Sequence, residues 1–365
     1  MTEGGGPRDF ADLAELERIA TEGWVGPVRT FVQAGAGAGL GIRANRAAHA
    51  KWSLRARVLV DVSRVDTTTT VLGVPLDLPV LIAPSGLHTL VCPEGEVATA
   101  RGARDANTVM VLSSATGRSI EDVTAVGGNV WFQLYWGRDR AQVRRLVDLA
   151  ATCGCRALCL TVDMPVPPLL GPEMRGGVAG VAHVRPRYLP SRGEATAAGT
   201  WEHDQRLTWR DLAWLREVCE LPLVVKGVMT AEDAVRAAEC GVEGIVVSNH
   251  GGRALDTPVG TMDVLPSIAA ALDRADARPE IYVDGGFRHG GEVVAALALG
   301  ARAVLVGRPA LWALKVGGAP GVARMIELLG HELSATMARV GATAISEIDA
   351  SRICAVASLS APPES

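Results

Sequence analysis

The sequence predicts a (β/α)8 barrel, in which a closed sheet of parallel strands is surrounded by helices. Two observations in the 365 residues predict this fold. Eight short, nearly continuous apolar runs alternate with stretches of helical periodicity, which is the pattern of a parallel sheet covered on its outer face. Polar side chains follow each run directly, and the carboxyl ends of barrel strands share one face, where active sites are built.

The expected elements follow one another regularly along the chain. Strands are expected at residues 79–83, 109–112, 130–134, 157–162, 223–225, 244–247, 281–283 and 303–306, and helices at 97–106, 140–152, 230–240, 291–300 and 321–340. Thr230 and Asp233 have the spacing of a capping box at the start of one helix. The glycine-rich stretch 35–41 lacks the GxGxxG spacing and follows a helical segment, so we interpret it as a connector rather than a dinucleotide-binding loop.

A single domain is expected over residues 1–365, with two segments outside the barrel. Residues 1–78 are expected to form an N-terminal extension of helices and a hairpin (60–78) that caps the barrel bottom. Residues 166–205, between the fourth and fifth strands, are rich in Pro, Gly, Arg and Ala and have no usable periodicity. A long irregular insertion at the active face is typical of a lid, and an unstructured surface loop is the alternative.

Composition and charge exclude several classes of protein. A hydrophobic content of 48% with 21% charged residues is typical of a globular protein, and a net charge of −4 with scattered basic residues argues against nucleic-acid binding. No apolar run is long enough for a membrane span, and the N-terminus lacks the apolar segment of a signal peptide. The seven cysteines lack zinc-site spacing, so we expect no metal and free thiols in a cytoplasmic protein.

The polar residues at the strand ends include one compact motif. One residue stands after each of the eight runs: Ser85, Ser113, Tyr135, Asp163, Lys226, His250, Asp284 and Arg308. Residues 248–256 read Ser-Asn-His-Gly-Gly-Arg-Ala-Leu-Asp and follow the sixth run directly. The two glycines let the backbone turn tightly, which keeps a base, His250, close to an anion-binding group, Arg253.

This motif resembles the active-site signature of the FMN-dependent α-hydroxy acid oxidases and dehydrogenases, the family of glycolate oxidase and the lactate dehydrogenase flavoproteins. The resemblance extends over nearly the whole chain, from about Leu16 to Ala355. It implies an FMN enzyme that oxidises the CH–OH carbon of an α-hydroxy acid or a derivative to the 2-oxo product.

The flavin half of the predicted site is complete. Segments 284–288 and 307–309 follow the seventh and eighth strands, which is the usual phosphate position of such barrels, and glycine N–H groups with Arg288 and Arg308 suit a dianion. The resemblance implies that further FMN contacts come from Pro84, Ser85, Gly86, Ser113, Gln133, Thr161, Ser248, Asp284, Gly286 and Gly307. Lys226 is expected to face the flavin edge where negative charge collects on reduction.

The proton-transfer residues are also present. His250 is the expected base, and Asp163 is expected to orient it and to stabilise its cation. The resemblance implies that Tyr135 donates a hydrogen bond to the oxygen being oxidised and that Arg253 binds a substrate carboxylate oxygen.

The substrate pocket departs from the family pattern at three places. Phe31 stands where relatives have a carboxylate-binding Tyr, Leu169 and Leu170 stand where they have an Arg pair, and Ala115 replaces a frequent Trp. Losing these polar partners would cost a small hydroxy acid several kcal/mol. We therefore expect a bulkier substrate that depends less on a free carboxylate: an α-hydroxy ester, amide or thioester, an aryl hydroxy acid, or an amine-bearing biosynthetic intermediate.

Other functions stay open at this point. The lid, for example through Arg175, could supply another cation, and the substrate would then be ordinary. Alternatives on the same barrel are CH–NH oxidation and ligand binding without turnover, against which His250, Asp163 and Lys226 argue. The His-Gly-Gly-Arg segment argues against a type 2 isopentenyl-diphosphate isomerase. The electron acceptor is O2 or another molecule, and the resemblance implies a homo-oligomer, commonly a tetramer.

Overall fold

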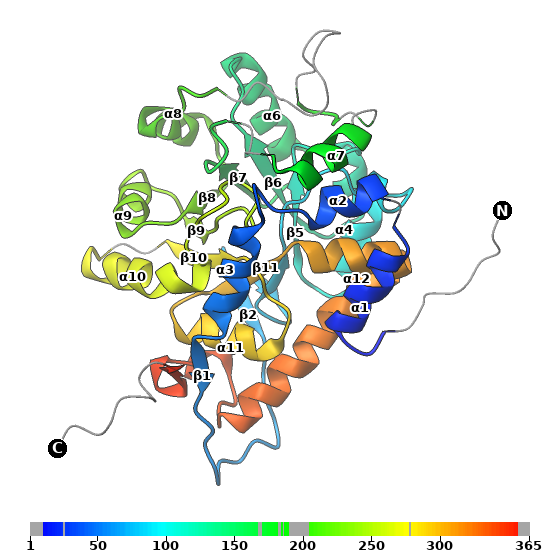
Figure 1. The fold of residues 1–365 in the computed structure, drawn as a ribbon. Coiled ribbons are helices and arrows are strands. Elements are labelled where there is room, and N and C mark those ends of the chain that lie inside the picture. The colour runs from blue at the N-terminus through cyan, green and yellow to red at the C-terminus, as the bar shows by residue number, and fades with distance from the viewer. Residues whose placement is uncertain are drawn as a thin grey trace.

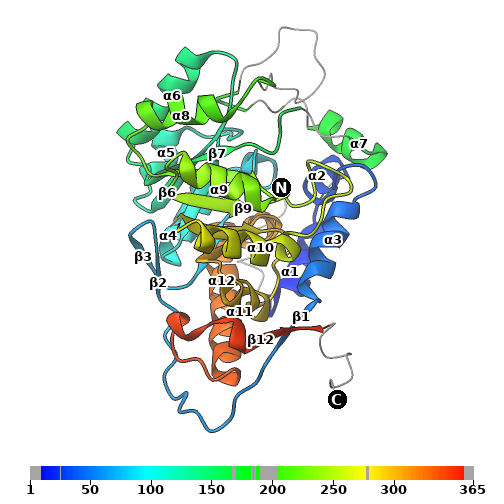
Figure 2. The same ribbon diagram turned by 90° about the vertical axis from the view of Figure 1, so that its left-hand side faces the viewer.

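A closed barrel of eight parallel strands forms the centre of the molecule (Figures 1 and 2). The computed structural model describes residues 10–24, 26–166, 170–181, 184, 186–189, 204–276 and 279–356. In chain order the barrel strands are β4 (Val80–Ile82), β5 (Val109–Ser113), β6 (Asn129–Tyr135), β7 (Ala157–Thr161), β8 (Leu223–Val228), β9 (Gly244–Val247), β10 (Glu280–Asp284) and β11 (Ala303–Val306). Each lies within a few residues of its predicted position, and the predicted fold class is confirmed.

The strands read as continuous apolar runs because both of their faces are buried. Along β5, Val109 and Val111 point into the barrel, where they pack with Trp131 and Tyr282, whereas Met110 and Leu112 pack under the surrounding helices. Alternate residues therefore fill two separate cores, one inside the barrel and one outside it. Polar side chains such as Gln133 and Lys226 are therefore confined mainly to the carboxyl-terminal parts of the strands.

The surrounding helices follow the predicted pattern with one large difference. They are α4 (Glu96–Asp105), α5 (Ile120–Thr124), α6 (Arg140–Thr152), α8 (Trp209–Val218), α9 (Ala231–Glu239), α10 (Thr261–Arg274), α11 (Gly290–Ala298) and α12 (Arg308–Arg339). The Thr230 side chain caps α9 by accepting from the Asp233 N–H. Helix α12 begins at Arg308, well before the predicted residue 321, because two helical pieces join across a kink at Gly318.

The N-terminal extension contains three helices, followed by strands at the opposite end of the barrel from the polar residues. The helices are α1 (Leu13–Glu22), α2 (Gly26–Gln33) and α3 (Leu40–His49), and the glycine-rich segment 35–41 connects α2 to α3 as predicted. Strand β1 (Trp52–Leu54) pairs with β12 (Ile353–Ala355), and β2 (Thr69–Val71) pairs with β3 (Val74–Leu76). Single 3₁₀ turns lie at η1 (His88–Leu90), η2 (Ile345–Glu347) and η3 (Ala350–Arg352).

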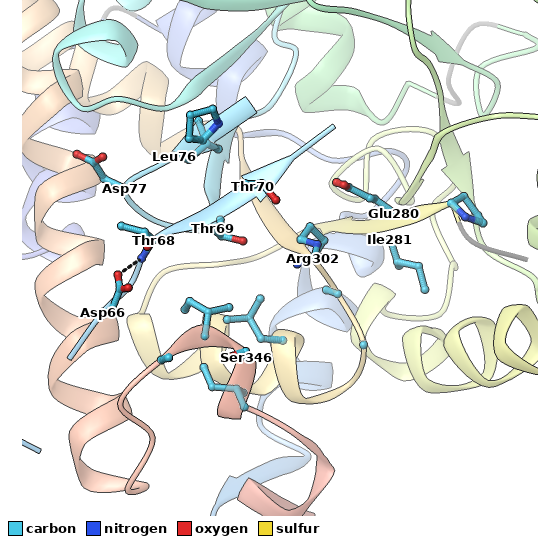
Figure 3. A pocket seen from close by; sticks show the side chains of 18 of the residues that line it. Asp66, Thr68, Thr69, Thr70, Leu76, Asp77, Glu280, Ile281, Arg302 and Ser346 are labelled. Atoms are coloured by element: carbon cyan, nitrogen blue, oxygen red, sulfur yellow. Dashed lines mark hydrogen bonds between the residues drawn. The ribbon is translucent and has the colours of Figure 1, made fainter. Parts of the chain in front are cut away.

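The hairpin of β2 and β3 closes the barrel bottom, although its strands are shorter than the predicted segment 60–78. Its residues Val71 and Leu76 pack into the inner barrel core. The carboxylate of Glu280 accepts from the N–H of Leu72 at the hairpin turn, which fastens the turn to the start of β10. A cavity of about 920 Å³ lies beside the hairpin. Figure 3 shows that the acidic side chains of Asp66, Asp77 and Glu280 line it, together with Arg302.

The insertion between β7 and β8 contains a helix, so the prediction of an irregular segment was wrong for this part. Helix α7 (Pro172–Gly180) lies beside α2 in both ribbon views. The two backbones approach closely: a Cβ atom built on Gly177 would lie 2.6 Å from the Phe31 nitrogen, and one on Gly180 would clash with Pro27. Glycines allow this contact, and the same glycines leave no apolar periodicity in the sequence from which the helix could be predicted.

The structure also bears on the predicted cysteine and membrane properties. All seven cysteines have free thiols, as predicted. None of the helices in the described part of the chain is long and apolar enough to cross a bilayer.

Candidate active site

The predicted polar residues meet at the carboxyl ends of the barrel strands. Lys226 lies on β8, and its Nζ donates to Ser248 Oγ, just past β9, at 2.8 Å. The same Nζ lies 3.1 Å from Asp284 Oδ2 at the end of β10. Residues that are widely separated in the sequence therefore form one connected cluster, because strands β8, β9 and β10 are neighbours in the barrel.

The Lys226–Asp284 pair is a buried ion pair. Both side chains are at least nine-tenths buried. Burial lowers the pKa of Lys226, but the carboxylates of Asp284 and Asp163 outweigh burial, and the net effect is a pKa above the ordinary lysine range. The lysine is therefore held as a cation. Asp284 Oδ1 is buried and has no hydrogen-bond partner among the described residues.

His250 and Asp163 form the second charged pair of the site. The His250 Nδ1 lies 2.9 Å from Asp163 Oδ1, so Nε2, on the other side of the ring, points away from this carboxylate. Burial raises the pKa of Asp163, but His250 and Lys226 outweigh it and hold this pKa below the usual carboxyl range. This contact would allow the ionised carboxylate to orient the imidazole and to stabilise its cation, which is the role expected from the sequence.

Tyr135 lies next to the expected base. Its hydroxyl oxygen is 3.4 Å from His250 Nε2, and the two rings are stacked with centroids 6.5 Å apart. Burial, with a further contribution from Asp163, raises the pKa of Tyr135 above its ordinary value. The phenol therefore stays protonated and can donate a hydrogen bond at the point where His250 can accept a proton.

A row of neutral hydrogen-bonding groups runs across the ends of β5, β6 and β7. Ser113 Oγ donates to Gln133 Oε1 at 2.8 Å, and Gln133 Nε2 donates to Thr161 Oγ1 at 2.9 Å. All three side chains are buried. Pro84, Ser85 and Gly86 lie half-buried just after β4, the next strand around the barrel.

Gly86 leaves little free space beside this row, although it has no side chain. A Cβ atom built on Gly86 would lie 2.8 Å from the Cβ of Ala115. The two small residues pack against each other, and the Leu87 N–H donates to the Ala115 carbonyl at 3.0 Å. The room left by the missing tryptophan at position 115 is thus partly filled by the loop after β4.

Two arginines share the carbonyl groups at the end of α2. Arg253 Nη1 donates to the Ala34 carbonyl at 2.7 Å, and Arg308 donates from Nε to the Val32 carbonyl at 3.1 Å and from Nη1 to the Gly251 carbonyl at 3.1 Å. The final carbonyls of a helix carry partial negative charge and suit cations. No carboxylate within the described part of the chain forms an ion pair with either guanidinium.

A third arginine, Arg288, lies after β10. Its guanidinium carbon stacks 4.4 Å from the Trp312 ring, and its Nε is 3.9 Å from Glu17. Burial lowers the pKa of Arg288 and of Arg253 to about 10. Burial, together with repulsion from Arg253 and Arg288, lowers the pKa of Arg308 to about 9. Arg308 is thus repelled by two neighbouring guanidiniums, and a bound anion would offset this repulsion.

These residues fit FMN. The arginines provide positive charge for a phosphate dianion, and Gly285 and Gly286 adopt φ angles of 103° and 88°, a backbone turn that favours glycine. The buried Asp284 Oδ1 without a partner and the row from Ser113 to Thr161 provide hydrogen-bonding groups for a polar ring system. The described residues contain no cluster of ligands that could hold a metal ion.

The residues on the substrate side are mostly apolar. Arg253 lies 5.6 Å from the centre of the Phe31 ring, and its Nε and Nη2 have no hydrogen-bond partner among the described residues. Leu170 is half-buried at the start of the α7 segment, whereas Leu169 lies outside the described residues. Arg175 is exposed on α7. Neither Phe31 nor Leu170 therefore offers Arg253 a polar partner.

Sequence reasoning missed the polar residues behind the catalytic loop. Asn45 on α3 and Asn249 next to His250 hydrogen-bond through both amide groups, and both are buried. No local spacing indicates this pair, since 204 residues separate its members. The carbonyls of Val32 and Ala34 were missed for the same reason, because backbone groups leave no mark in the sequence.

The chain matches known proteins over almost its whole length. The profile of the FMN-dependent dehydrogenase family matches residues 20–355. An L-lactate oxidase of Nostoc sp. is 42% identical over 359 residues, which cover 93% of this chain and 97% of that protein. A 4-hydroxymandelate oxidase of Amycolatopsis orientalis is 38% identical over 345 residues, which cover 92% of this chain and 96% of that protein.

A solved structure agrees with the fold. It is a mandelate oxidase in which one arginine is replaced by leucine, with 2-hydroxy-phenylacetamide. It is 38% identical to this chain, covers 95% of this chain and 98% of its own, and has a TM-score of 0.84.

Proposed function

The chain belongs to the FMN-dependent dehydrogenase family and is an FMN-dependent oxidoreductase of the α-hydroxy acid oxidase type, and we propose that its substrate is a bulky α-hydroxy carbonyl compound whose carboxylate is modified as an amide or ester. The observation that carries the substrate assignment is the environment of Arg253. This guanidinium lies over the Phe31 ring and shares helix-end carbonyls with Arg308, and no carboxylate among the described residues pairs with it. Phe31 and Leu170 stand where a hydroxyl and a second substrate-binding arginine were expected.

Each residue of the proposed catalytic group has one task. FMN supplies a two-electron acceptor when it is bound. His250 Nε2 accepts a proton from the CH–OH group, while Asp163 holds the ring and stabilises its cation. Tyr135 donates a hydrogen bond to the substrate oxygen. Lys226, held charged by Asp284, stabilises the negative charge that collects on the flavin side.

The cofactor contacts are proposed on the geometry described above. We assign the phosphate to Arg288, Arg308, Gly286 and Gly307, and the ring system to Pro84, Ser85, Gly86, Ser113, Gln133, Thr161, Ser248 and Asp284. The repulsion among the buried arginines supports the phosphate assignment, because a dianion removes this repulsion.

The apolar surroundings of Arg253 support a substrate without a free carboxylate. A carboxylate there would lose the second charged partner that an Arg at position 170 would provide, and unpaired buried charge is costly. A neutral carbonyl oxygen needs only one or two donors, which Arg253 Nε and Nη2 can provide. The related mandelate oxidase with 2-hydroxy-phenylacetamide combines an arginine-to-leucine replacement with an amide ligand, which supports this choice.

A substrate screen tests the proposal. Anaerobic bleaching of the flavin absorbance would be followed with glycolate, lactate, mandelate and the amide and methyl ester of mandelate. We expect the two mandelate derivatives to reduce the flavin at least about 10²-fold more efficiently than glycolate or lactate, because an unpaired charge and an unfilled pocket each cost 1 kcal/mol or more. Glycolate or lactate turned over as well as the bulky compounds would refute the substrate assignment.

We propose O2 as the acceptor that reoxidises the flavin, a cytoplasmic location and a role in a biosynthetic pathway. Two of the similar proteins are oxidases, which supports O2 as the acceptor. The seven free thiols support a reducing compartment. Mixing the reduced enzyme with air-saturated buffer tests the acceptor: reoxidation within seconds is expected, and reoxidation over many minutes would point to another acceptor.

We further infer that the chain forms a homo-oligomer, tetrameric in analogy to its relatives, through the hairpin end of the barrel. Val58, Leu59 and Val60 are exposed in succession there, and Leu59 is fully exposed with a φ of 59°. The segment around them is basic, with Arg55, Arg57 and Arg64 against Asp61. The neighbouring cavity carries Asp66, Asp77, Asp273 and Glu280 against Arg302 (Figure 3). A basic apolar segment and an acidic cavity on one face suit contact with a second copy.

The oligomer is tested by sedimentation of the FMN-loaded protein. We expect the parent to sediment as an oligomer and Leu59→Asp to shift to smaller species, because a charge placed in an apolar contact is costly. Leu255→Asp changes an equally apolar, exposed side chain at the other end of the barrel and should not alter the mass. A monomeric parent, or a Leu59→Asp variant of unchanged mass, would refute this interface.

A further inference from the structure

Two buried asparagines connect the N-terminal extension to the loop that carries the proposed base. Asn45 Nδ2 donates to Asn249 Oδ1 at 2.8 Å, and Asn249 Nδ2 donates to Asn45 Oδ1 at 2.8 Å. The exposed fractions of the two residues are 2% and 5%. A reciprocal amide pair out of reach of water has fixed geometry, because breaking either bond leaves a buried donor and a buried acceptor unsatisfied.

Asn249 shapes the loop next to it. The three residues after it, His250, Gly251 and Gly252, all have positive φ angles, of 59°, 61° and 77°. Such a conformation is strained for a histidine and persists only where the surroundings impose it. The side-chain oxygen of Asn249 accepts from the Gly252 N–H at 3.1 Å, and its Nδ2 also donates to the Val259 carbonyl at 3.0 Å.

Asn45 reaches the proposed phosphate loop as well. Its Oδ1 accepts from the Thr261 N–H at 3.2 Å, and Thr261 Oγ1 donates to the Asp284 carbonyl at 2.6 Å. A Cβ atom built on Gly285 would lie 2.8 Å from Asn45 Nδ2, so the turn after β10 lies directly against this amide. One side chain therefore contacts both the loop after β9 and, through Thr261, the loop after β10.

We propose that Asn45 is a positioning residue that sets the direction of His250 through Asn249 and keeps the base loop in register with the FMN phosphate loop. This role rests on the proposed function of His250 and of segment 284–288. It explains why a residue of the N-terminal extension, outside the barrel, is buried against two strand ends of the active face. It also predicts that Asn45 and Asn249 act as one unit.

A double-mutant cycle tests this unit. Asn45→Ala, Asn249→Ala and the double variant would be compared for the rate constant of flavin reduction, for the Kd of FMN with the apoprotein, and for hydrogen exchange at the Gly252 and Thr261 amides. Thr108→Val is the control, since it removes a buried side-chain hydrogen bond to the Val80 carbonyl at the opposite end of the barrel.

Each single variant is expected to lower the reduction rate constant about tenfold with little change in KM, to weaken FMN binding, and to speed exchange at both amides. The double variant should be no worse than either single variant, because the same contacts are lost. Thr108→Val is expected to lower stability without changing the rate constant or the FMN affinity. The same result for the asparagine variants, or additive effects in the double variant, would overturn the proposal.

The parent protein provides a measurement that does not depend on the variants folding. Its Gly252 and Thr261 amides should exchange as slowly as the amides of the barrel strands, and fast exchange would overturn the proposal. If His250→Ala retains activity, the proposed base is wrong, but the exchange rates and FMN affinities of the asparagine variants still test the positioning role. The two failures are therefore distinguishable.

Discussion

The two sides of the active site solve the problem of buried charge in different ways. On the flavin side, Lys226 pairs with Asp284 and Asp163 pairs with His250, so charges are matched by side chains of the protein itself. On the substrate side, Arg253 is accompanied by Phe31 and by helix-end carbonyls. The two pairs on the first side are organised before any ligand arrives, whereas Arg253 has donors that a ligand must complete.

This difference separates chemistry from specificity. Preorganised charges stabilise a transition state without reorganisation, so they suit a cofactor and a reaction that do not vary. A pocket with one cation and apolar walls discriminates by shape and by the cost of unpaired charge. Changes on the flavin side should therefore remove activity towards all substrates, and changes on the substrate side should alter which substrate is used.

The largest effect is expected from a change of His250, on the flavin side. His250→Ala should lower the rate of flavin reduction about 10³-fold or more for every substrate, because general-base catalysis contributes up to about 10⁴-fold. Flavin content should be unchanged, since His250 acts on the substrate. Rapid-mixing absorbance under anaerobic conditions measures the rate, and His331→Ala on the exposed face of α12 is the control. Reduction at the parent rate would place the base elsewhere.

The next largest effect is expected on the substrate side. Phe31→Tyr combined with Leu170→Arg would restore a hydroxyl and a second cation beside Arg253. Relative efficiency for lactate over mandelamide should rise about 10²-fold, as two charge-assisted hydrogen bonds of about 1.5–3 kcal/mol become available. The ratio of kcat/KM values measures the change. An unchanged ratio would mean that these positions do not face the substrate.

Cofactor binding should respond more moderately to single changes. Arg288→Ala or Arg308→Ala removes a charge-assisted hydrogen bond of about 1.5–3 kcal/mol, so the Kd of FMN should rise roughly tenfold to a hundredfold. Fluorescence quenching on titration of the apoprotein measures this Kd. The exposed Arg144 on α6 provides the control, Arg144→Ala. If both variants and the control bind FMN equally well, the phosphate lies elsewhere.

The sequence predicted the flavin side far better than the substrate side. Strand ends are marked by apolar runs, so Lys226, His250 and Asp284 could be placed on one face without a structure. Helix α7 could not be predicted, because glycines such as Gly177 serve backbone contact and leave no periodic pattern. The Asn45–Asn249 pair and the carbonyls beside Arg253 depend on contacts between distant segments, which no local spacing reveals.

The pH dependence can sharpen the flavin side of the comparison. The carboxylate of Asp284 raises the pKa of Lys226, so the charge of this lysine persists above its ordinary pKa and is lost only at more alkaline pH. In Asp284→Asn, burial dominates and the charge should be lost at lower pH. The reduction rate of this variant should therefore fall between about pH 8 and about pH 10, where the parent still retains the lysine charge.

An exposed ion pair provides the control for this pH profile. Lys51 and Asp263 lie 2.8 Å apart on the surface, so Asp263→Asn removes a carboxylate beside a lysine that water already solvates. Its profile should match that of the parent. An Asp284→Asn profile that also matches the parent would show that the charge of Lys226 does not contribute to the rate.

The smallest effect is expected where α7 meets α2, on the substrate side. Gly177 faces the Phe31 backbone, whereas nothing lies within 4 Å of a Cβ atom built on its neighbour Gly176. Gly177→Ala should push α7 away from α2 and raise KM for the bulky substrate about threefold to tenfold, roughly 1 kcal/mol, with FMN affinity unchanged. Gly176→Ala should leave KM unchanged and stabilise the helix by up to about 1 kcal/mol, because alanine favours helix more than glycine does.

Steady-state kinetics and thermal unfolding of the Gly177→Ala and Gly176→Ala variants measure the difference. Equal KM values would mean that α7 covers the pocket without determining its shape, and specificity would then reside in Phe31, Arg253 and Ala115.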